Sequence, residues 1–135
     1  MSVLHMLDTD IASYLIKGRA VQVEAKLSLL APAMVCVSVV TQAELMYGLK
    51  RLPDSHPLHH AVRQFLSIVR VLAWDSEAAN YYAGIRHQLV SSGQTIGEMD
   101  MMIATHSLSA NAVLVTNNIR HYVRIETPLT LVNWA

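Results

Sequence analysis

Five short stretches of the chain are almost continuously apolar, and segments with helical spacing separate most of them. The apolar stretches cover residues 3–7, 34–40, 71–74, 112–116 and 129–132. A strand that is apolar on both sides has to be covered on both sides, as in a parallel sheet between two layers of helices. We therefore expect an α/β fold in which a parallel twisted β-sheet is flanked by helices on both faces.

The expected helices are marked by caps and by apolar residues at helical spacing. They cover residues 11–17, 21–30, 41–51, 56–69, 76–91 and 98–109. Thr41 and Glu44 have the spacing of a capping box, which places the start of the third helix at Thr41. No linker, repeat or low-complexity segment divides the sequence, so we expect a single domain over residues 1–135.

Composition narrows the class of protein. The apolar fraction, 53%, is high for a soluble domain, and we expect part of it to form an interface with a second copy or a partner. Ten basic and ten acidic residues leave no net charge, so the sequence lacks the basic excess of a non-specific nucleic-acid binder. No apolar run approaches the roughly 20 residues of a membrane helix, and His5 and Asp8 do not fit a signal peptide. With Cys36 as the lone cysteine, we expect a cytoplasmic protein.

Three acidic residues stand where an expected strand ends or a helix begins. Asp8 follows residues 3–7, Glu44 comes shortly after residues 34–40, and Asp100 opens the last long helix. Parallel strands end at one edge of their sheet, where ligands bind. Carboxylates are costly to bury unpaired, and a hard cation such as Mg²⁺ takes their oxygens as ligands. The three acids therefore form a candidate metal site, although each also suits a helix cap or first turn.

Other polar residues near the same expected edge are weaker candidates for supporting roles around a metal. They are Thr9, Asp10, Ser38, Glu98, Thr116 and Asn117, with Asn118 beside them. The two asparagines also suit a tight turn. No glycine-rich phosphate loop is present, and the histidines show no pattern of a nucleophile with its base.

Several segments resemble PIN-domain ribonucleases. Residues 7–10 resemble their LDTN opening, residues 37–48 their S-x-x-T-x-x-E-L-x-x-G segment, and residues 96–104 their G-x-x-D-x-x-I-A segment. Residues 115–118 match V-T-N-N/D, and residues 129–134 resemble the closing L-x-x-x-N/D-W. The matches run in order over nearly the whole chain, and within the family they look most like VapC, the toxin of VapBC toxin–antitoxin systems.

The resemblance implies an endoribonuclease that depends on Mg²⁺ or Mn²⁺. Asp8, Glu44 and Asp100 match the metal-binding acids of the family. Asn118 falls where many members carry a fourth acid, and an amide oxygen can bind a metal or orient a water. Asp10 stands where asparagine is usual, and we hypothesise that it partly restores the negative charge that Asn118 lacks.

The resemblance also implies partners. They are a VapB-type antitoxin, whose arginine would block the carboxylates by bidentate pairing, a second copy of the chain in a homodimer, and a structured RNA substrate such as tRNA. No membrane partner is expected. Three alternatives stay open: a catalytically weak PIN-like module that acts with its partner in DNA binding and autoregulation, a DNA nuclease of related fold, and a structural domain whose acids only cap helices.

Overall fold

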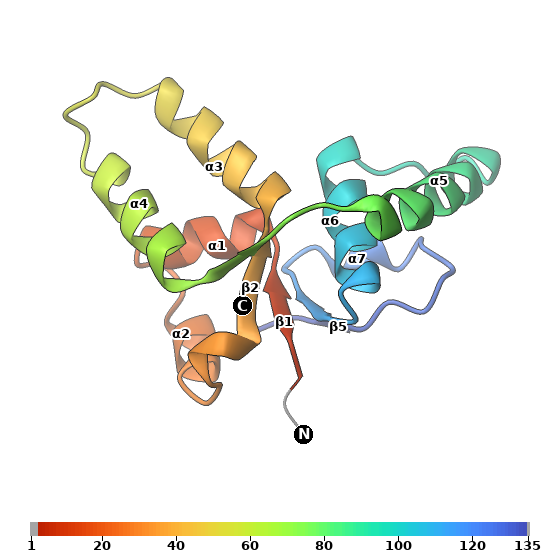
Figure 1. Cartoon of the computed structure of the whole chain (residues 1–135), viewed down its shortest axis with the longest axis horizontal. Helices are drawn as coiled ribbons and strands as arrows, with labels where there is room; N and C mark the ends of the chain where they lie inside the picture. The colour runs from red at the N-terminus through yellow and green to blue at the C-terminus, as the bar shows by residue number, and fades with distance from the viewer. Residues whose placement is uncertain (1–2, 135) are drawn as a thin grey trace.

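A sheet of five parallel strands lies at the centre of the molecule in a computed structural model, which describes residues 3–134 (Figure 1). The strands are β1 (His5–Leu7), β2 (Val35–Ser38), β3 (Arg70–Leu72), β4 (Val113–Val115) and β5 (Leu131–Val132). Their order in the sheet is β3-β2-β1-β4-β5, and all four pairings are parallel. The α/β fold with a parallel sheet is therefore confirmed. A single domain over residues 1–135 stays a prediction.

Two groups of helices cover the sheet. The helices are α1 (Thr9–Ile16), α2 (Val21–Leu27), α3 (Val39–Lys50), α4 (Leu58–Ile68), α5 (Ser76–Ser91), α6 (Glu98–Ser109) and α7 (Ile119–Tyr122). Figure 1 shows α1 to α4 on one side of the sheet and α5 to α7 on the other, and α3 also contacts α6. None of the helices in the described part of the chain is long and apolar enough to cross a membrane.

Alternation of side chains along the strands gives each group of helices its own core. Met6, Cys36 and Leu114 point into a cluster with residues of α5 and α6, while Leu7 and Val115 join a cluster with residues of α1 and α2. Successive residues of a strand face opposite sides of the sheet, so a continuously apolar strand supplies both clusters. This is why the apolar stretches of the sequence mark the strands so clearly.

The register of the strands brings their carboxyl ends level. Leu7 of β1 pairs with Val37 of β2 and with Val115 of β4. Directly after these three paired residues come Asp8, Ser38 and Thr116, and all three are buried. Three polar residues that lie far apart in the sequence therefore meet at one edge of the sheet.

The structure corrects the expected start of α3. Residues 34–40 were expected to form a strand, but β2 ends at Ser38 and the helix begins at Val39. The Ser38 hydroxyl caps the helix by accepting a hydrogen bond from the backbone N–H of Val40 at 3.0 Å. The capping box expected at Thr41 and Glu44 is therefore wrong, because Thr41 lies inside the helix. The apolar pair at residues 39–40 continues the strand pattern in the sequence, which hid the short turn from strand to helix.

Candidate active site

Asp8 is the most deeply placed acid of the site. Asp8 is 3% exposed, and its backbone N–H donates to the carbonyl of Val115 at 3.0 Å. One carboxylate oxygen, Oδ1, accepts from the backbone N–H of Ile11 at 3.0 Å, which caps α1. The other, Oδ2, accepts from the Thr116 hydroxyl at 2.6 Å. Asp8 thus has the capping role expected for it and is fixed in addition by the neighbouring strand.

The surroundings of Asp8 favour its protonated form in the absence of a cation. The pKa of the Asp8 carboxyl is raised to about 6, chiefly by burial and to a smaller extent by the negative charges of Asp10 and Asp100, and the two hydrogen bonds from Thr116 and Ile11 act in the opposite direction. Desolvation and like charge both act against the carboxylate. A bound cation would reverse this balance, because it would supply the missing positive charge.

Glu44 reaches the same edge from α3. The Thr9 hydroxyl donates to its Oε1 at 2.6 Å, and the hydroxyls of Thr9 and Thr41 are 3.1 Å apart. Thr9 follows Asp8 directly, so this bond ties Glu44 to the end of β1. Glu44 also lines a pocket of about 330 Å³ together with Asp10. The hydrogen bond to Glu44 is consistent with the supporting role predicted for Thr9, which stays a prediction.

Asp100 approaches from the first turn of α6 and is half-buried. Burial raises the pKa of its carboxyl, as does the charge of Asp10, while His121 and the Tyr122 hydroxyl lower it. His121 Nδ1 lies 3.9 Å from Asp100 Oδ2. His121 and Tyr122 belong to α7, which the sequence did not predict because a four-residue helix has no periodicity to detect.

Asn118 connects Thr116 to Asp10. Its backbone N–H donates to the Thr116 hydroxyl oxygen at 2.9 Å, and its side-chain amide donates to Asp10 Oδ2 at 3.4 Å. The structure therefore places Asn118 and Asp10 side by side, as the hypothesis of a compensating charge requires. That hypothesis itself stays a prediction.

The three other predicted supporting residues have different surroundings. The buried Ser38 hydroxyl lies 2.7 Å from Nδ1 of His106, and this bond joins the start of α3 to α6. Glu98 is exposed and lies 3.4 Å from the Arg86 guanidinium. Asn117 is exposed and lines a separate pocket with Tyr14 and Arg19. The hydrogen bonds found for Ser38 and the ion pair found for Glu98 do not join either residue to the acids.

The donor set fits a hard divalent cation. Carboxylate oxygens from Asp8, Asp100 and Glu44 come from three elements that meet at one sheet edge, and the amide of Asn118 lies beside them. Oxygen donors of this kind are the ligands that Mg²⁺ and Mn²⁺ take. As the side chains stand, no three acidic, histidine or cysteine residues within residues 3–134 are close enough together to hold an ion.

Comparison with known proteins decides the family. The family model of the PIN domain matches residues 5–126. The chain belongs to the PIN-domain family. Ribonuclease VapC2 from Haemophilus influenzae is 35% identical over 131 residues, covering 97% of this chain and 98% of the relative. A tRNA(fMet)-specific endonuclease VapC from Shigella flexneri is 35% identical over 120 residues, covering 89% of this chain and 90% of the relative. Within the PIN-domain family, the chain groups with VapC proteins.

Solved PIN-domain structures confirm the fold. VapBC2 from Rickettsia felis, bound to a DNA fragment from its promoter, matches with a TM-score of 0.90 and 33% identity, over 98% of this chain and 99% of that chain. VapBC-1 from nontypeable Haemophilus influenzae matches with a TM-score of 0.86 and 32% identity, over 97% of this chain and 98% of that chain. Both are structures of VapBC. The family resemblance read from the sequence is thus confirmed, while the roles of individual site residues stay predictions.

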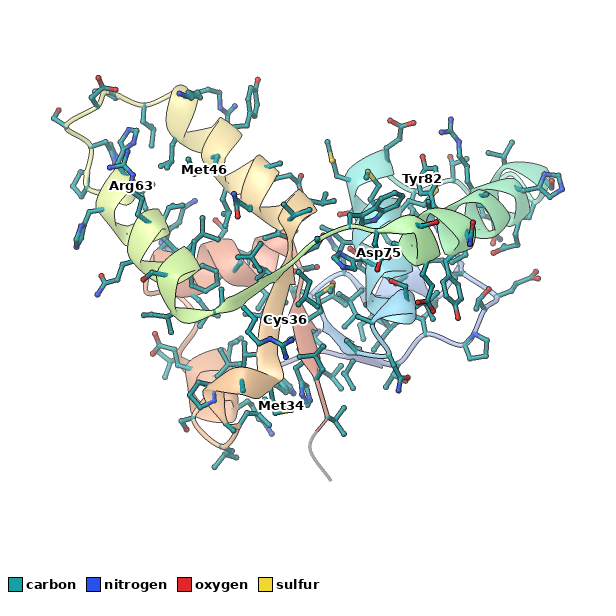
Figure 2. The ribbon with its side chains drawn as sticks, viewed as in Figure 1. Met34, Cys36, Met46, Arg63, Asp75 and Tyr82 are labelled. Carbon is teal, nitrogen blue, oxygen red and sulfur yellow. The ribbon has the colours of Figure 1, made fainter. Side chains whose placement is uncertain are left out.

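Figure 2 shows the two groups of helices on either side of β2. Met46 and Arg63 lie on the pair formed by α3 and α4, on the opposite side of the picture from Tyr82 on α5 and from Asp75 at its cap. Cys36 lies on β2 between them. Glu44 comes from the first of these groups and Asp100 from the second, so the site spans the division between the two groups of helices.

Proposed function

We propose that the protein is an endoribonuclease toxin that depends on Mg²⁺ or Mn²⁺ and cuts structured RNA such as tRNA. The observation that carries the proposal is the buried carboxylate of Asp8, whose pKa is raised to about 6 beside Asp10 and Asp100. Such a perturbed acid at the carboxyl edge of a parallel sheet is typical of a functional site. Relatives named as ribonucleases, at 35% identity over nearly the full chain, support RNA as the substrate.

Asp8, Asp100 and Glu44 would hold the cation, with Asn118 as a further oxygen donor. When bound, a divalent ion supplies a water of lowered pKa and neutralises charge on the phosphoryl oxygens. The chain's own residues set the geometry. Thr116 fixes Asp8 through Oδ2, and Thr9 fixes Glu44 through Oε1, each at 2.6 Å. Because these hydroxyls orient the carboxylates before a cation arrives, less ordering remains to be done on binding.

Basic residues near the acids suit an RNA backbone. Lys17 and Arg51 line the same pocket as Asp10 and Glu44. The guanidinium carbon of Arg51 lies 5.6 Å from the centre of the Tyr47 ring, a cation–π contact that helps to hold the side chain in place. The chain carries no net charge, so phosphate binding depends on such local positive groups rather than on a basic surface overall.

The proposed partners are a VapB-type antitoxin and a second copy of the chain. Solved neighbours that are VapBC complexes support the antitoxin. We expect an antitoxin arginine to pair with the acids and so compete with the cation. Light scattering on the purified chain would test the homodimer, and a monomer at micromolar concentration would contradict it.

A substrate panel tests the proposed activity. Purified protein would be incubated with tRNA, unstructured RNA, and single- and double-stranded DNA, in EDTA, Mg²⁺ or Mn²⁺. We expect cleavage of tRNA in either metal, none in EDTA, and none of DNA. Sequencing of RNA ends after brief expression without antitoxin would identify the bond that is cut. Cleavage of DNA in place of RNA would favour the related DNA nuclease.

A second candidate function is DNA binding with the partner. The Rickettsia felis neighbour was solved on a DNA fragment from its promoter, which supports this role for a complex of the chain with an antitoxin. If the panel shows no cleavage with either metal while the complex binds its own promoter in a gel-shift assay, this account replaces the enzyme.

A further inference from the structure

Tyr122 places a phenol hydroxyl in the interior next to the acids. The residue is 1% exposed and belongs to α7, which follows Asn118. The charges of Asp100, Asp8 and Asp10 all act on its phenol, with Asp100 the strongest of the three. The hydroxyl thus lies close to the Asp100 carboxylate, on the side of the sheet where α6 packs.

The Tyr122 hydroxyl makes no hydrogen bond of ordinary geometry with any residue of the described part of the chain. Buried polar groups are normally satisfied, and one that is not costs free energy relative to an apolar group of the same shape. Phenylalanine would fill the same space without that cost. Packing of the ring alone therefore does not explain the hydroxyl, whereas a hydrogen bond to a neighbouring group would.

The neighbouring group is the carboxylate of Asp100. Asp100 lies in the first turn of α6, and its carboxyl is only half-buried. Asp8 accepts hydrogen bonds at both oxygens, and Glu44 accepts one from Thr9, whereas the contact of Asp100 with His121 is long at 3.9 Å. The described part of the chain gives Asp100 no hydrogen bond of ordinary geometry, although the Tyr122 hydroxyl is close enough to lower the pKa of its carboxyl.

We propose that Tyr122 is a positioning residue for Asp100, and that its O–H donates to the Asp100 carboxylate when that carboxylate binds a divalent cation. The proposal rests on the proposed function, since it concerns the same cation site. A phenol carries one O–H donor, and this one is buried beside the Asp100 carboxylate. Donors of this kind commonly orient a ligating carboxylate and raise metal affinity.

Tyr122→Phe tests the proposal, because it removes only the oxygen and keeps the buried ring. The Kd for Mn²⁺ would be measured by calorimetry on the purified full chain, and the melting temperature would be measured in EDTA and in Mn²⁺. We expect the Kd to rise about tenfold, with a melting temperature in EDTA at or above that of the wild type. Tyr81→Phe on α5 is the matched control, since that ring is 36% exposed, and it should change neither value.

The two readouts separate a positioning role from a structural one. A Kd equal to that of the wild type would overturn the proposal and leave the proposed function standing. A melting temperature in EDTA that falls by several degrees would also overturn it, because the hydroxyl would then support the metal-free fold. A wild-type chain that binds no Mn²⁺ at all would contradict the proposed function and this proposal with it.

Discussion

Replacing Asp8 with asparagine should stabilise the metal-free protein at neutral pH. The pKa of the buried Asp8 carboxyl is raised to about 6, from about 4 in an unfolded chain, and each unit is worth about 1.4 kcal/mol. The folded state therefore favours the protonated acid. This contribution to stability is complete below about pH 4 and is lost as the pH rises through about 6. Above that pH, the ionised Asp8 costs the fold about 2–3 kcal/mol relative to a neutral side chain.

Asparagine removes the charge and keeps the cap, and its amide nitrogen takes the place of the oxygen that accepts from Thr116. It is as good a helix cap as aspartate, so the bond from Ile11 that begins α1 is retained. Urea unfolding in EDTA, followed by the fluorescence of Trp74 and Trp134, would give the free energy of unfolding of both proteins between pH 4.5 and 8. We expect the advantage of the variant to grow by about 2 kcal/mol across this range and to level off above pH 7.

The matched control is Asp75→Asn at the cap of α5. Asp75 accepts a hydrogen bond from the backbone N–H of Ala78 at 3.1 Å, as Asp8 does from Ile11, but its residue is exposed. This variant controls for the exchange of a capping carboxylate for an amide at an exposed position, and at pH 8 its free energy of unfolding should stay close to that of the wild type. If Asp8→Asn is no more stable relative to the wild type at pH 8 than at pH 4.5, the argument from desolvation is refuted.

Three further predictions concern the surroundings of the site. Thr116→Val removes the hydroxyl that donates to the buried acid, and calorimetry should show a Kd for Mn²⁺ about tenfold higher; an unchanged Kd would contradict this. His106→Leu removes a buried hydrogen bond to the cap of α3, and urea unfolding should show a loss of about 1–3 kcal/mol. Burial lowers the pKa of His106, so the stability that His106 contributes should decline as the pH falls below about 6.5. A difference between the variant and the wild type that does not vary with pH would contradict this effect of burial. Replacing Lys17 and Arg51 together with alanine should weaken tRNA binding in filter assays and reduce its salt dependence, whereas Lys26→Ala, outside that pocket, should leave both unchanged.

The fold was largely predictable because its strands are short and apolar on both sides. This pattern is specific to a parallel sheet covered by helices, and the five expected strands all exist. The bounds of α6 were also correct, since Gly97 precedes it and apolar spacing continues to Ser109. The error at Val39 has a local cause, because a β-branched pair fits a strand and a helix alike and only the bond at Ser38 decides between them.

The acids at the site were predictable, but their connections were not. Asp8, Glu44 and Asp100 stand at strand ends and helix starts that the sequence marks plainly. The bonds that join them cross the sheet, as from Thr116 to Asp8 and from Thr9 to Glu44, and no local spacing encodes such a register. Tyr122 was missed for the same reason, because its ring is held in the core and its oxygen reaches the site only through the packing of α7.

The central claim is that the three carboxylates hold a divalent cation that RNA cleavage requires. The most direct test is cleavage of tRNA by the purified chain across a series of Mn²⁺ concentrations, with Asp100→Asn beside Glu126→Gln as a matched exposed control. We predict that the wild type and the Glu126 variant cut at rates that rise with Mn²⁺ and saturate. The Asp100 variant should remain folded and fail to cut at any concentration. Cleavage by the Asp100 variant at the wild-type rate, or by the wild type in EDTA, would contradict the account.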